Sequence, residues 1–199
     1  MSIIALDFET ANENRASACA VGLAWIKGRQ VVRVEERLIR PTPFRFSPFN
    51  VRVHGITAAD VANQPEFMDV MSSYFPDLAN SLVIAHNAAF DMSVLRAALD
   101  HRGQRYPTFS YLCTVKMARL VWPDMTSAAL PVLASRLGVT FEHHQAGADA
   151  YACARVAIAA AELLGVADVS EIPDRIGLAP GALFETGWRP CSSPRVPRA

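Results

Sequence analysis

Ile3-Ile4-Ala5-Leu6-Asp7-Phe8-Glu9 is the stretch that decides the fold, because apolar residues alternate along it in the manner of a β-strand. Side chains on a strand point to opposite faces in turn, so one face is apolar and the other carries Asp7 and Glu9. Two further strand candidates, 18–26 and 30–39, are joined by a Gly-containing turn at 27–29. We therefore expect the chain to begin with an antiparallel meander of three strands.

The rest of the chain alternates helix and strand patterns. The expected elements are short helices at 57–62 and 65–78, a buried strand at 82–85, a helix at 88–101, a strand at 108–113, and helices at 114–121, 130–137 and 147–164. Strands followed by alternating elements are typical of a mixed α/β fold with helices packed on a sheet. Residues 1–170 are predicted to form one domain. Residues 171–199, which hold five of the 13 prolines, are predicted to form a Pro-rich irregular tail anchored by Phe184 and Trp188.

The composition describes a folded chain with balanced charge. Of 199 residues, 51% are hydrophobic, and 19 basic side chains balance 19 acidic ones. A uniformly basic nucleic-acid-binding surface is therefore excluded, and a phosphate-bearing substrate has to be held by local charge. Four cysteines without a CxxC pair indicate thiols in a reducing cytoplasm rather than a disulfide framework or structural zinc. No signal peptide is evident, and the apolar stretch 152–166 is too short and too charged to span a bilayer, so we expect no membrane association.

Three acidic segments carry the chemistry. They are Asp7-Phe8-Glu9-Thr10, His86-Asn87-Ala88-Ala89-Phe90-Asp91 and His144-Gln145-Ala146-Gly147-Ala148-Asp149. Carboxylates gathered from three segments repel one another unless cations lie between them, and carboxylate oxygens are ligands that Mg²⁺ and Mn²⁺ prefer. A histidine beside such ions takes a proton from water near neutral pH. The segments therefore predict a site for two divalent cations with a histidine as base.

Each segment taken alone also has a simpler explanation. Asp7 and Glu9 suit an exposed acidic strand face. Asp91 and Asp149 suit the first turn of a helix, where acidic residues offset the helix dipole. His144 suits a surface loop. These explanations stay open for the segments considered one at a time.

Taken together and in this order, the segments resemble the motifs of the DEDD family of 3′→5′ exonucleases. The resemblance is to its DEDDh branch, which includes the proofreading subunits of bacterial replicative polymerases, ribonuclease T and oligoribonuclease. It covers about residues 3–164 and includes the His-x4-Asp spacing of the third motif. The segments 49–57, 113–114, 120–123 and 133–139 also resemble the proofreading-type members. The family implies a ribonuclease H-like α/β fold, in which helices flank a central five-stranded mixed sheet.

The resemblance implies a role for each acidic residue. Asp7 would bridge two divalent cations, Mg²⁺ or Mn²⁺. Glu9 and Asp149 would complete the site of the ion that holds the attacking water, and Asp91 would support the second ion. The two ions, about 4 Å apart, would clamp the attacking and leaving oxygens of the scissile phosphate. The products would be nucleoside 5′-monophosphates released from a 3′ end.

The remaining site residues also follow from the resemblance. His144 would be the general base, because the family spacing favours it over its neighbour His143. The residues expected to contact the terminal nucleotide are Phe8, Thr10, His54 and Asn87. For each of these four, packing in the core is the alternative, and for Phe8 it carries equal weight.

The function implied is that of a metal-dependent 3′→5′ exonuclease acting on single-stranded ends, on DNA in preference to RNA, in proofreading or DNA repair. Two alternatives stay open: RNA or short oligoribonucleotides as substrate, and a non-catalytic module that binds nucleic acid or a DNA polymerase. Such a module would be expected to have lost one of the five predicted catalytic residues, and all five are present. The tail does not resemble polymerase-binding or clamp-binding tails, which weighs against a replisome role. The oligomeric state stays undetermined.

Overall fold

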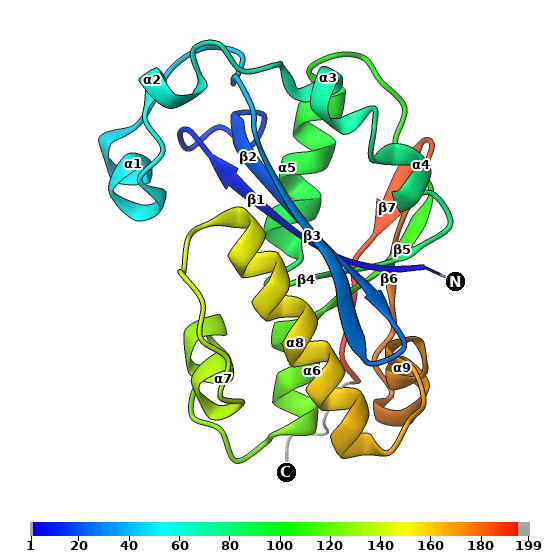
Figure 1. The fold of residues 1–199 in the computed structure, drawn as a ribbon. Coiled ribbons are helices and arrows are strands. Elements are labelled where there is room, and N and C mark those ends of the chain that lie inside the picture. The colour runs from blue at the N-terminus through cyan, green and yellow to red at the C-terminus, as the bar shows by residue number, and fades with distance from the viewer. Residues whose placement is uncertain (1, 195–199) are drawn as a thin grey trace.

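A computed structural model describes residues 2–194 (Figure 1). The strands are β1 (Ile3–Thr10), β2 (Ala18–Lys27), β3 (Gln30–Leu38), β4 (Leu82–Ala85), β5 (Phe109–Cys113), β6 (Gly181–Phe184) and β7 (Gly187–Arg189). The helices are α1 (Pro48–His54), α2 (Ala58–Val61), α3 (Phe67–Met71), α4 (Phe75–Leu78), α5 (Ala89–Asp100), α6 (Thr114–Val121), α7 (Leu130–Arg136), α8 (Ala146–Leu164) and α9 (Ile172–Ile176), with a 3₁₀ turn at Val169–Glu171. The predicted α/β class is confirmed.

One mixed sheet organises the described residues, with strand order β3-β2-β1-β4-β5-β6-β7. The expected meander is present, since β2 pairs antiparallel with both β1 and β3. β1 also pairs in parallel with β4, and β4 with β5. Parallel pairing needs a crossover connection, which the helices between these strands supply. The sheet has seven strands where five were expected.

The two additional strands come from the C-terminal segment, for which the prediction of an irregular tail was wrong. Helix α9 is followed by the β6–β7 hairpin, and β6 pairs antiparallel with the edge strand β5. Leu183 and Cys191 are the buried anchors, whereas the expected anchors Phe184 and Trp188 are 42% and 48% exposed. Strands this short give little periodic signal. They are stabilised by pairing, β6 with β5 and β7 with β6. The predicted boundary at residue 170 stays a prediction, and residues 195–199 lie outside the described part.

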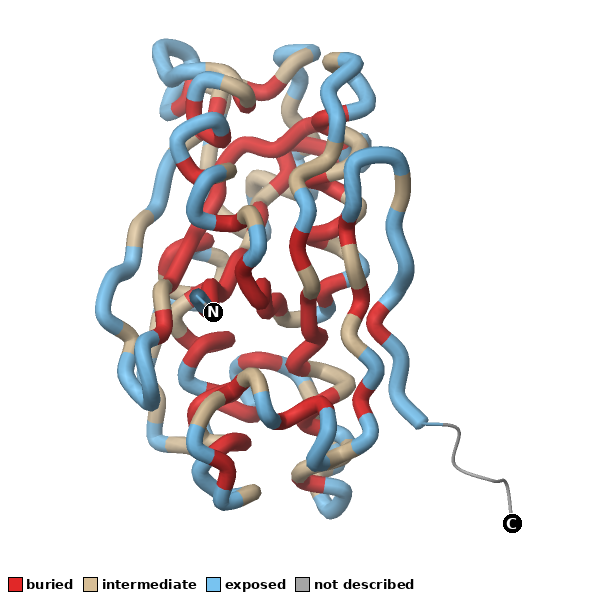
Figure 2. Tube along the Cα trace, turned by 90° about the vertical axis from the view of Figure 1, so that its right-hand side faces the viewer, coloured by how far each residue is buried: buried red, intermediate tan, exposed pale blue. Residues whose placement is uncertain are grey.

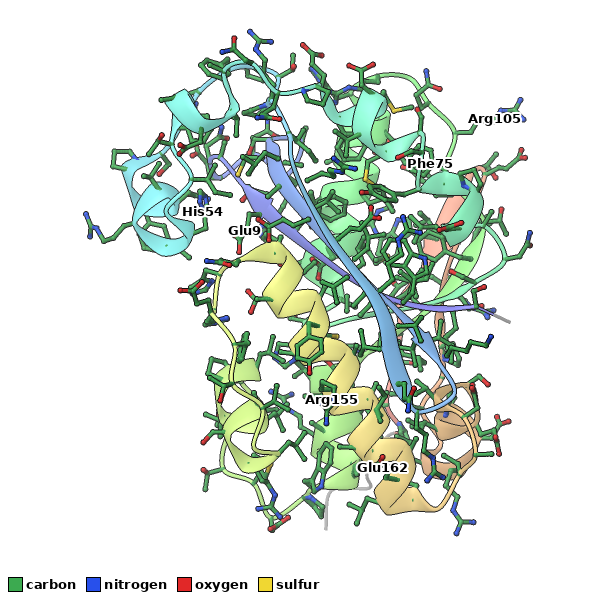
Figure 3. The ribbon with its side chains drawn as sticks, viewed as in Figure 1. Glu9, His54, Phe75, Arg105, Arg155 and Glu162 are labelled. Atoms are coloured by element: carbon green, nitrogen blue, oxygen red, sulfur yellow. The ribbon has the colours of Figure 1, made fainter. Side chains whose placement is uncertain are left out.

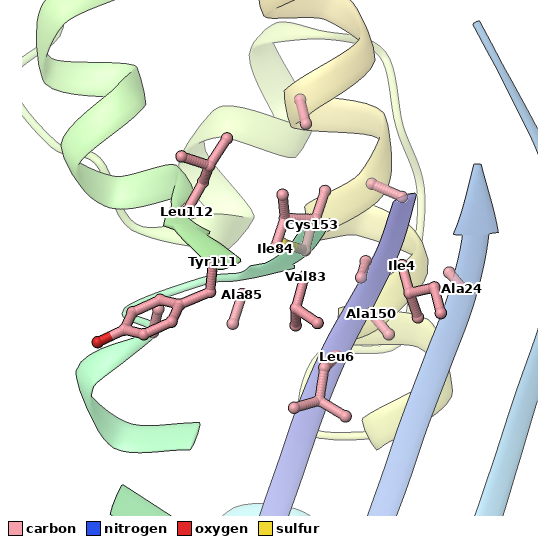
Figure 4. Packing of buried hydrophobic residues seen from close by; sticks show 14 of the residues in the cluster. Ile4, Leu6, Ala24, Val83, Ile84, Ala85, Tyr111, Leu112, Ala150 and Cys153 are labelled. Atoms are coloured by element: carbon pink, nitrogen blue, oxygen red, sulfur yellow. The ribbon is translucent and has the colours of Figure 1, made fainter. Parts of the chain in front are cut away.

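Helices cover both faces of the sheet. α8 lies across β1, β2 and β3 with α6 beside it, and α5 lies behind the sheet (Figure 1). Buried residues run through the centre of the molecule, and exposed ones follow its outer loops (Figure 2). Figure 4 shows Ile4 and Leu6 of β1 packed near Val83 and Ile84 of β4. Each fully buried aliphatic side chain of this kind contributes about 1.5–3 kcal/mol relative to an exposed one.

The helices of residues 2–194 include none with both the length and the apolarity that a membrane crossing requires.

Candidate active site

The first two segments meet where β1 extends beyond β4. β4 pairs with β1 only along Ile3–Ala5, so the later amides of β1 face no strand on that side. Asp91, in the first turn of α5, takes this position, because the Phe8 N–H donates to its Oδ1 at 3.0 Å. The second carboxylate oxygen of Asp91 is buried and has no hydrogen-bond partner among the described residues. The strand edge thus brings Asp91 next to Asp7 and leaves one oxygen available.

The third segment arrives at the start of α8. Asp149 lies in the first turn of this helix and is 3% exposed. Its Oδ2 accepts the backbone N–H of His144 at 2.9 Å, and its Oδ1 accepts Nδ1–H of His143 at 2.8 Å. Asp7, Glu9 and Asp149 each offer a carboxylate oxygen, and these three oxygens lie within 4.8 Å of one another. In Figure 3, Glu9 lies at the end of β1 beside the start of α8.

A row of three residues across the sheet fixes where α8 begins. The strand registers place Gly22 of β2 opposite Asp7 on one side and opposite Glu36 of β3 on the other. A Cβ at Gly22 would lie 1.9 Å from the Ala146 carbonyl oxygen, so only glycine leaves room for the helix terminus. The Glu36 carboxylate accepts the Gly147 N–H at 2.7 Å, which satisfies one of the free amides at the start of a helix. The row therefore sets the distance between Asp149 and Asp7.

Burial, together with the crowding of carboxylates, raises the pKa of each of three groups. Burial, followed by the charges of Asp91, Asp149 and Glu9, holds the pKa of Asp7 well above its usual value. Burial and the Asp149 charge raise the pKa of Glu9 to about 8. Burial raises the pKa of Asp91 to about 7, against the opposing effect of the Phe8 N–H. Without a cation, these groups retain protons at neutral pH that ordinary carboxyl groups lose.

The donor set fits divalent cations. The carboxylates converge, one buried oxygen of Asp91 lacks a partner, and oxygen ligands are those that Mg²⁺ and Mn²⁺ prefer. A charge of +2 would also offset the burial of negative charge and the repulsion that together raise the three pKa values. Asp7, Glu9, Asp149 and Asp91 are therefore the residues suited to hold such ions.

His144 lies at the edge of this cluster. Its Nδ1 is 3.9 Å from the Glu9 Oε1, and its side chain is 41% exposed. Its φ of +69° lets the backbone N–H reach Asp149 while the ring stacks on His143, with ring centroids 3.7 Å apart. Burial, and then His143, lower the pKa of His144. The ring is thus neutral at neutral pH and able to accept a proton, whereas Nδ1 of His143 is already engaged with Asp149.

A cavity of about 470 Å³ opens beside the carboxylates, and Thr10 and His54 lie in its wall, where their contact with a nucleotide stays a prediction. Nδ1 of His54 accepts the Ile56 N–H at 3.0 Å, so the proton is on Nε2, which donates to the Thr10 carbonyl at 3.1 Å. Asn50 donates to the same carbonyl at 2.8 Å. These bonds fix the backbone around Thr10. His54 projects from α1 toward this corner (Figure 3).

The other two expected nucleotide contacts are placed differently. Phe8 also borders this cavity, but it is only 2% exposed and its ring stacks on Phe67 of α3, with centroids 6.1 Å apart, as the core-packing alternative predicts. Asn87, with φ of +61°, lines two neighbouring pockets rather than this cavity. His86 lines the cavity instead, and its Nδ1 lies 2.9 Å from the Thr114 hydroxyl. Burial lowers the pKa of His86 to about 4, so it is neutral.

The sequence matches the model of a known protein family. A family model described as Exonuclease matches residues 4–157. The chain belongs to this exonuclease family. The predicted resemblance to DEDDh exonucleases is thereby confirmed at the level of the family, and the chain carries a domain of the exonuclease type.

The chain is similar in sequence to named proteins and in fold to a solved exonuclease structure. The DNA polymerase III PolC-type of Clostridium perfringens is 27% identical over 159 residues, which are 77% of this chain and 11% of that protein. Exodeoxyribonuclease 10 of Escherichia coli is 31% identical over 134 residues, 65% of this chain and 55% of that protein. The structure of Exonuclease X in complex with 5′-overhanging duplex DNA gives a TM-score of 0.72 at 25% identity, covering 88% of this chain and 99% of that one. The chain thus spans about half or less of the curated relatives named here.

Sequence reasoning missed Gly22, Glu36 and His86 as parts of the site. Gly22 and Glu36 are revealed only by the strand register. Gly22 acts by leaving room for the Ala146 carbonyl, and Glu36 acts by accepting the Gly147 N–H. His86 had a signal in the sequence, since it stands inside the second acidic segment. A closer reading of that segment would have included it.

Proposed function

We propose that this chain is a metal-dependent 3′→5′ exonuclease that removes nucleotides from single-stranded ends, of DNA in preference to RNA. The observation that carries the proposal is the convergence of Asp7, Glu9 and Asp149 within 4.8 Å, with Asp91 and His144 beside them. Membership of the exonuclease family supports the reaction class. The name of exodeoxyribonuclease 10 and the DNA bound to Exonuclease X support DNA as substrate.

The site residues have different roles in the proposed hydrolysis. Asp7, Glu9, Asp91 and Asp149 would hold two divalent cations, Mg²⁺ or Mn²⁺, which when bound supply positive charge at the scissile phosphate and a water of lowered pKa. His144 accepts a proton from the attacking water, because its lowered pKa keeps the ring neutral.

The terminal nucleotide occupies the cavity beside these residues. The backbone near Thr10, which His54 and Asn50 hold in place, meets its 3′-hydroxyl. The products are nucleoside 5′-monophosphates.

A stepwise degradation assay tests the reaction. A 5′-labelled single-stranded DNA and its RNA counterpart are incubated with Mg²⁺ or Mn²⁺, with Asp7→Asn as the isosteric control. We expect a ladder that shortens from the 3′ end, faster for DNA, and no ladder from the variant. Shortening without metal, or equal shortening by the variant, would contradict the proposal. Binding of the strand without hydrolysis, with each metal tried, would favour the alternative of a non-catalytic module.

Partner and location remain predictions. The similarity to PolC-type DNA polymerase III supports association with a DNA polymerase, which co-purification with a polymerase subunit would test. A reducing cytoplasm agrees with the four cysteines, which are free thiols in the structure.

A further inference from the structure

Two surface pockets continue from the active-site cavity toward the C-terminal hairpin. The middle pocket, about 450 Å³, shares His86 with the cavity and is bordered by Arg119 and residues 125–129. The hairpin pocket, about 120 Å³, shares Asn87 with the middle pocket and is bordered by residues of α5, α6 and β7. The shared residues make the three hollows neighbours on the surface.

The lining of the two pockets is positive. Arg119 borders the middle pocket, and Lys116 and Arg96 border the hairpin pocket. Neither pocket has an acidic residue in its wall. None of these three cations forms an ion pair with another residue of the range 2–194, whereas Arg33, Arg40, Arg45, Arg105 and Arg136 all do. In a chain of zero net charge, these pockets are therefore places where phosphate groups are attracted.

The hairpin pocket combines these cations with an exposed aromatic ring. The guanidinium of Arg96 lies 4.0 Å from the centroid of the Trp188 ring, and Trp188 is 48% exposed. Lys116 donates from Nζ to the Cys191 carbonyl at 2.5 Å, which leaves two of its donors available. Pairing of β7 with β6 fixes the Trp188 backbone. The ring is thus presented from a rigid element.

The helix α5 connects this pocket to the catalytic carboxylates. Asp91 stands in its first turn, and Ala89 and Arg96, seven residues apart, share the face that borders the hairpin pocket. Of these two pockets only the middle one shares a residue with the active-site cavity, so a strand whose 3′ end lies in that cavity would meet the middle pocket first and the hairpin pocket next.

We propose that the strand upstream of the scissile phosphate follows these pockets, with its phosphates near Arg119, Lys116 and Arg96 and one base stacked on Trp188. This rests on the proposed function and adds a second contact region, which includes Trp188 from outside residues 4–157, the range that the exonuclease family model matches. The occupant is single-stranded nucleic acid because cations beside an aromatic ring are what such strands bind. Adjacency to the active-site cavity supports the same occupant.

Binding of oligothymidylates of increasing length tests the path. The background is Asp7→Asn in Mg²⁺, so that strands are not degraded, and anisotropy of a 5′ label reports affinity. Arg96→Gln should weaken long strands, leave a dinucleotide unchanged, and lower the slope of log affinity against log salt by about 0.7. Trp188→Ala should weaken long strands about 5- to 150-fold, and Trp188→Phe should restore most of this loss.

A matched control is Trp25→Ala, since Arg33 also lies 4.0 Å from the Trp25 ring centroid on a strand far from these pockets. It should leave binding unchanged. If Arg96→Gln and Trp188→Ala bind long strands as tightly as the background does, the path is refuted. If they weaken the dinucleotide equally, the path is also refuted. Failure of the wild-type protein to hydrolyse any strand would instead refute the proposed function.

Discussion

Replacing Gly22 with alanine is expected to damage the metal site more than the fold. The new Cβ would lie 1.9 Å from the Ala146 carbonyl oxygen and 2.5 Å from the Gly147 nitrogen. Real Cβ contacts essentially never fall below 3.0 Å, so the start of α8 has to retreat by at least about 1.1 Å. Asp149 moves with it, and protein ligands hold metals within about 0.2 Å of their usual distances.

The expected size of the effect follows from this displacement. A misplacement of about 1 Å costs on the order of 100-fold in rate, and overpacking costs about 1–3 kcal/mol of stability. We therefore expect Gly22→Ala to lower kcat/KM about 100-fold on a labelled oligonucleotide and to weaken Mn²⁺ binding measured by calorimetry without substrate. Gly147→Ala should cost less, because its Cβ would lie 3.1 Å from both the Cβ and the Oε2 of Glu36, so a shift of a few tenths of an ångström relieves the contact.

The control is a substitution that lowers stability far from the site. Ile172→Val removes one buried methylene at α9 and should cost about 0.5–1.5 kcal/mol in urea unfolding, with kcat/KM unchanged. If Gly22→Ala folds and keeps both its Mn²⁺ affinity and its kcat/KM within about threefold of wild type, the reasoning about the strand row is wrong.

Three further predictions concern charge and proton transfer. In EDTA, the free energy of unfolding should fall as pH rises from about 4.5 to 8, by up to about 1.4 kcal/mol per pH unit per proton. The reason is that the raised pKa of Glu9 makes the folded state hold more protons than the unfolded state. Urea titrations should show a shallower fall for Glu9→Gln than for the wild type, and an equal fall would contradict this. Glu36→Ala should weaken Mn²⁺ binding, measured by calorimetry, about 10- to 100-fold. Glu36→Gln keeps an acceptor for the Gly147 N–H and should bind Mn²⁺ nearly as tightly as the wild type. Equal losses for the two variants would contradict the view that Glu36 positions the start of α8. His144→Ala should lower kcat about 10²- to 10⁴-fold. His143→Ala should lower kcat less, because His143 acts through Asp149. The reverse order in single-turnover rates would make His143 the base.

The sequence was sufficient to predict the parts of the site that local patterns encode. Alternation along β1 places Asp7 and Glu9 on one face and Phe8 on the other, and the structure has Phe8 buried on that other face. The short helix expected at 57–62 is present as α2, where Thr57 and Asp60 form a capping box. Helices and strands with a strong period of their own were therefore located within a few residues.

Features that depend on pairing between distant segments were not predictable in this way. The β6–β7 hairpin exists because β5 offers an edge, and residues 181–189 have no apolar run longer than Ala182-Leu183-Phe184. Glu36 reads as one of several charges on β3 until the register places it opposite Gly22 and next to Gly147. Asn87 and His86 are neighbours in the sequence, and which of them borders the cavity is seen only in the structure, where Asn87 has a positive φ and His86 lines the cavity.

The most direct measurement is an anomalous difference map from a crystal grown with Mn²⁺. We expect two peaks, one among Asp7, Glu9 and Asp149 and one between Asp7 and the free oxygen of Asp91. A well-ordered crystal with Mn²⁺ in the medium and no peak among these side chains would contradict the view that cations neutralise this cluster.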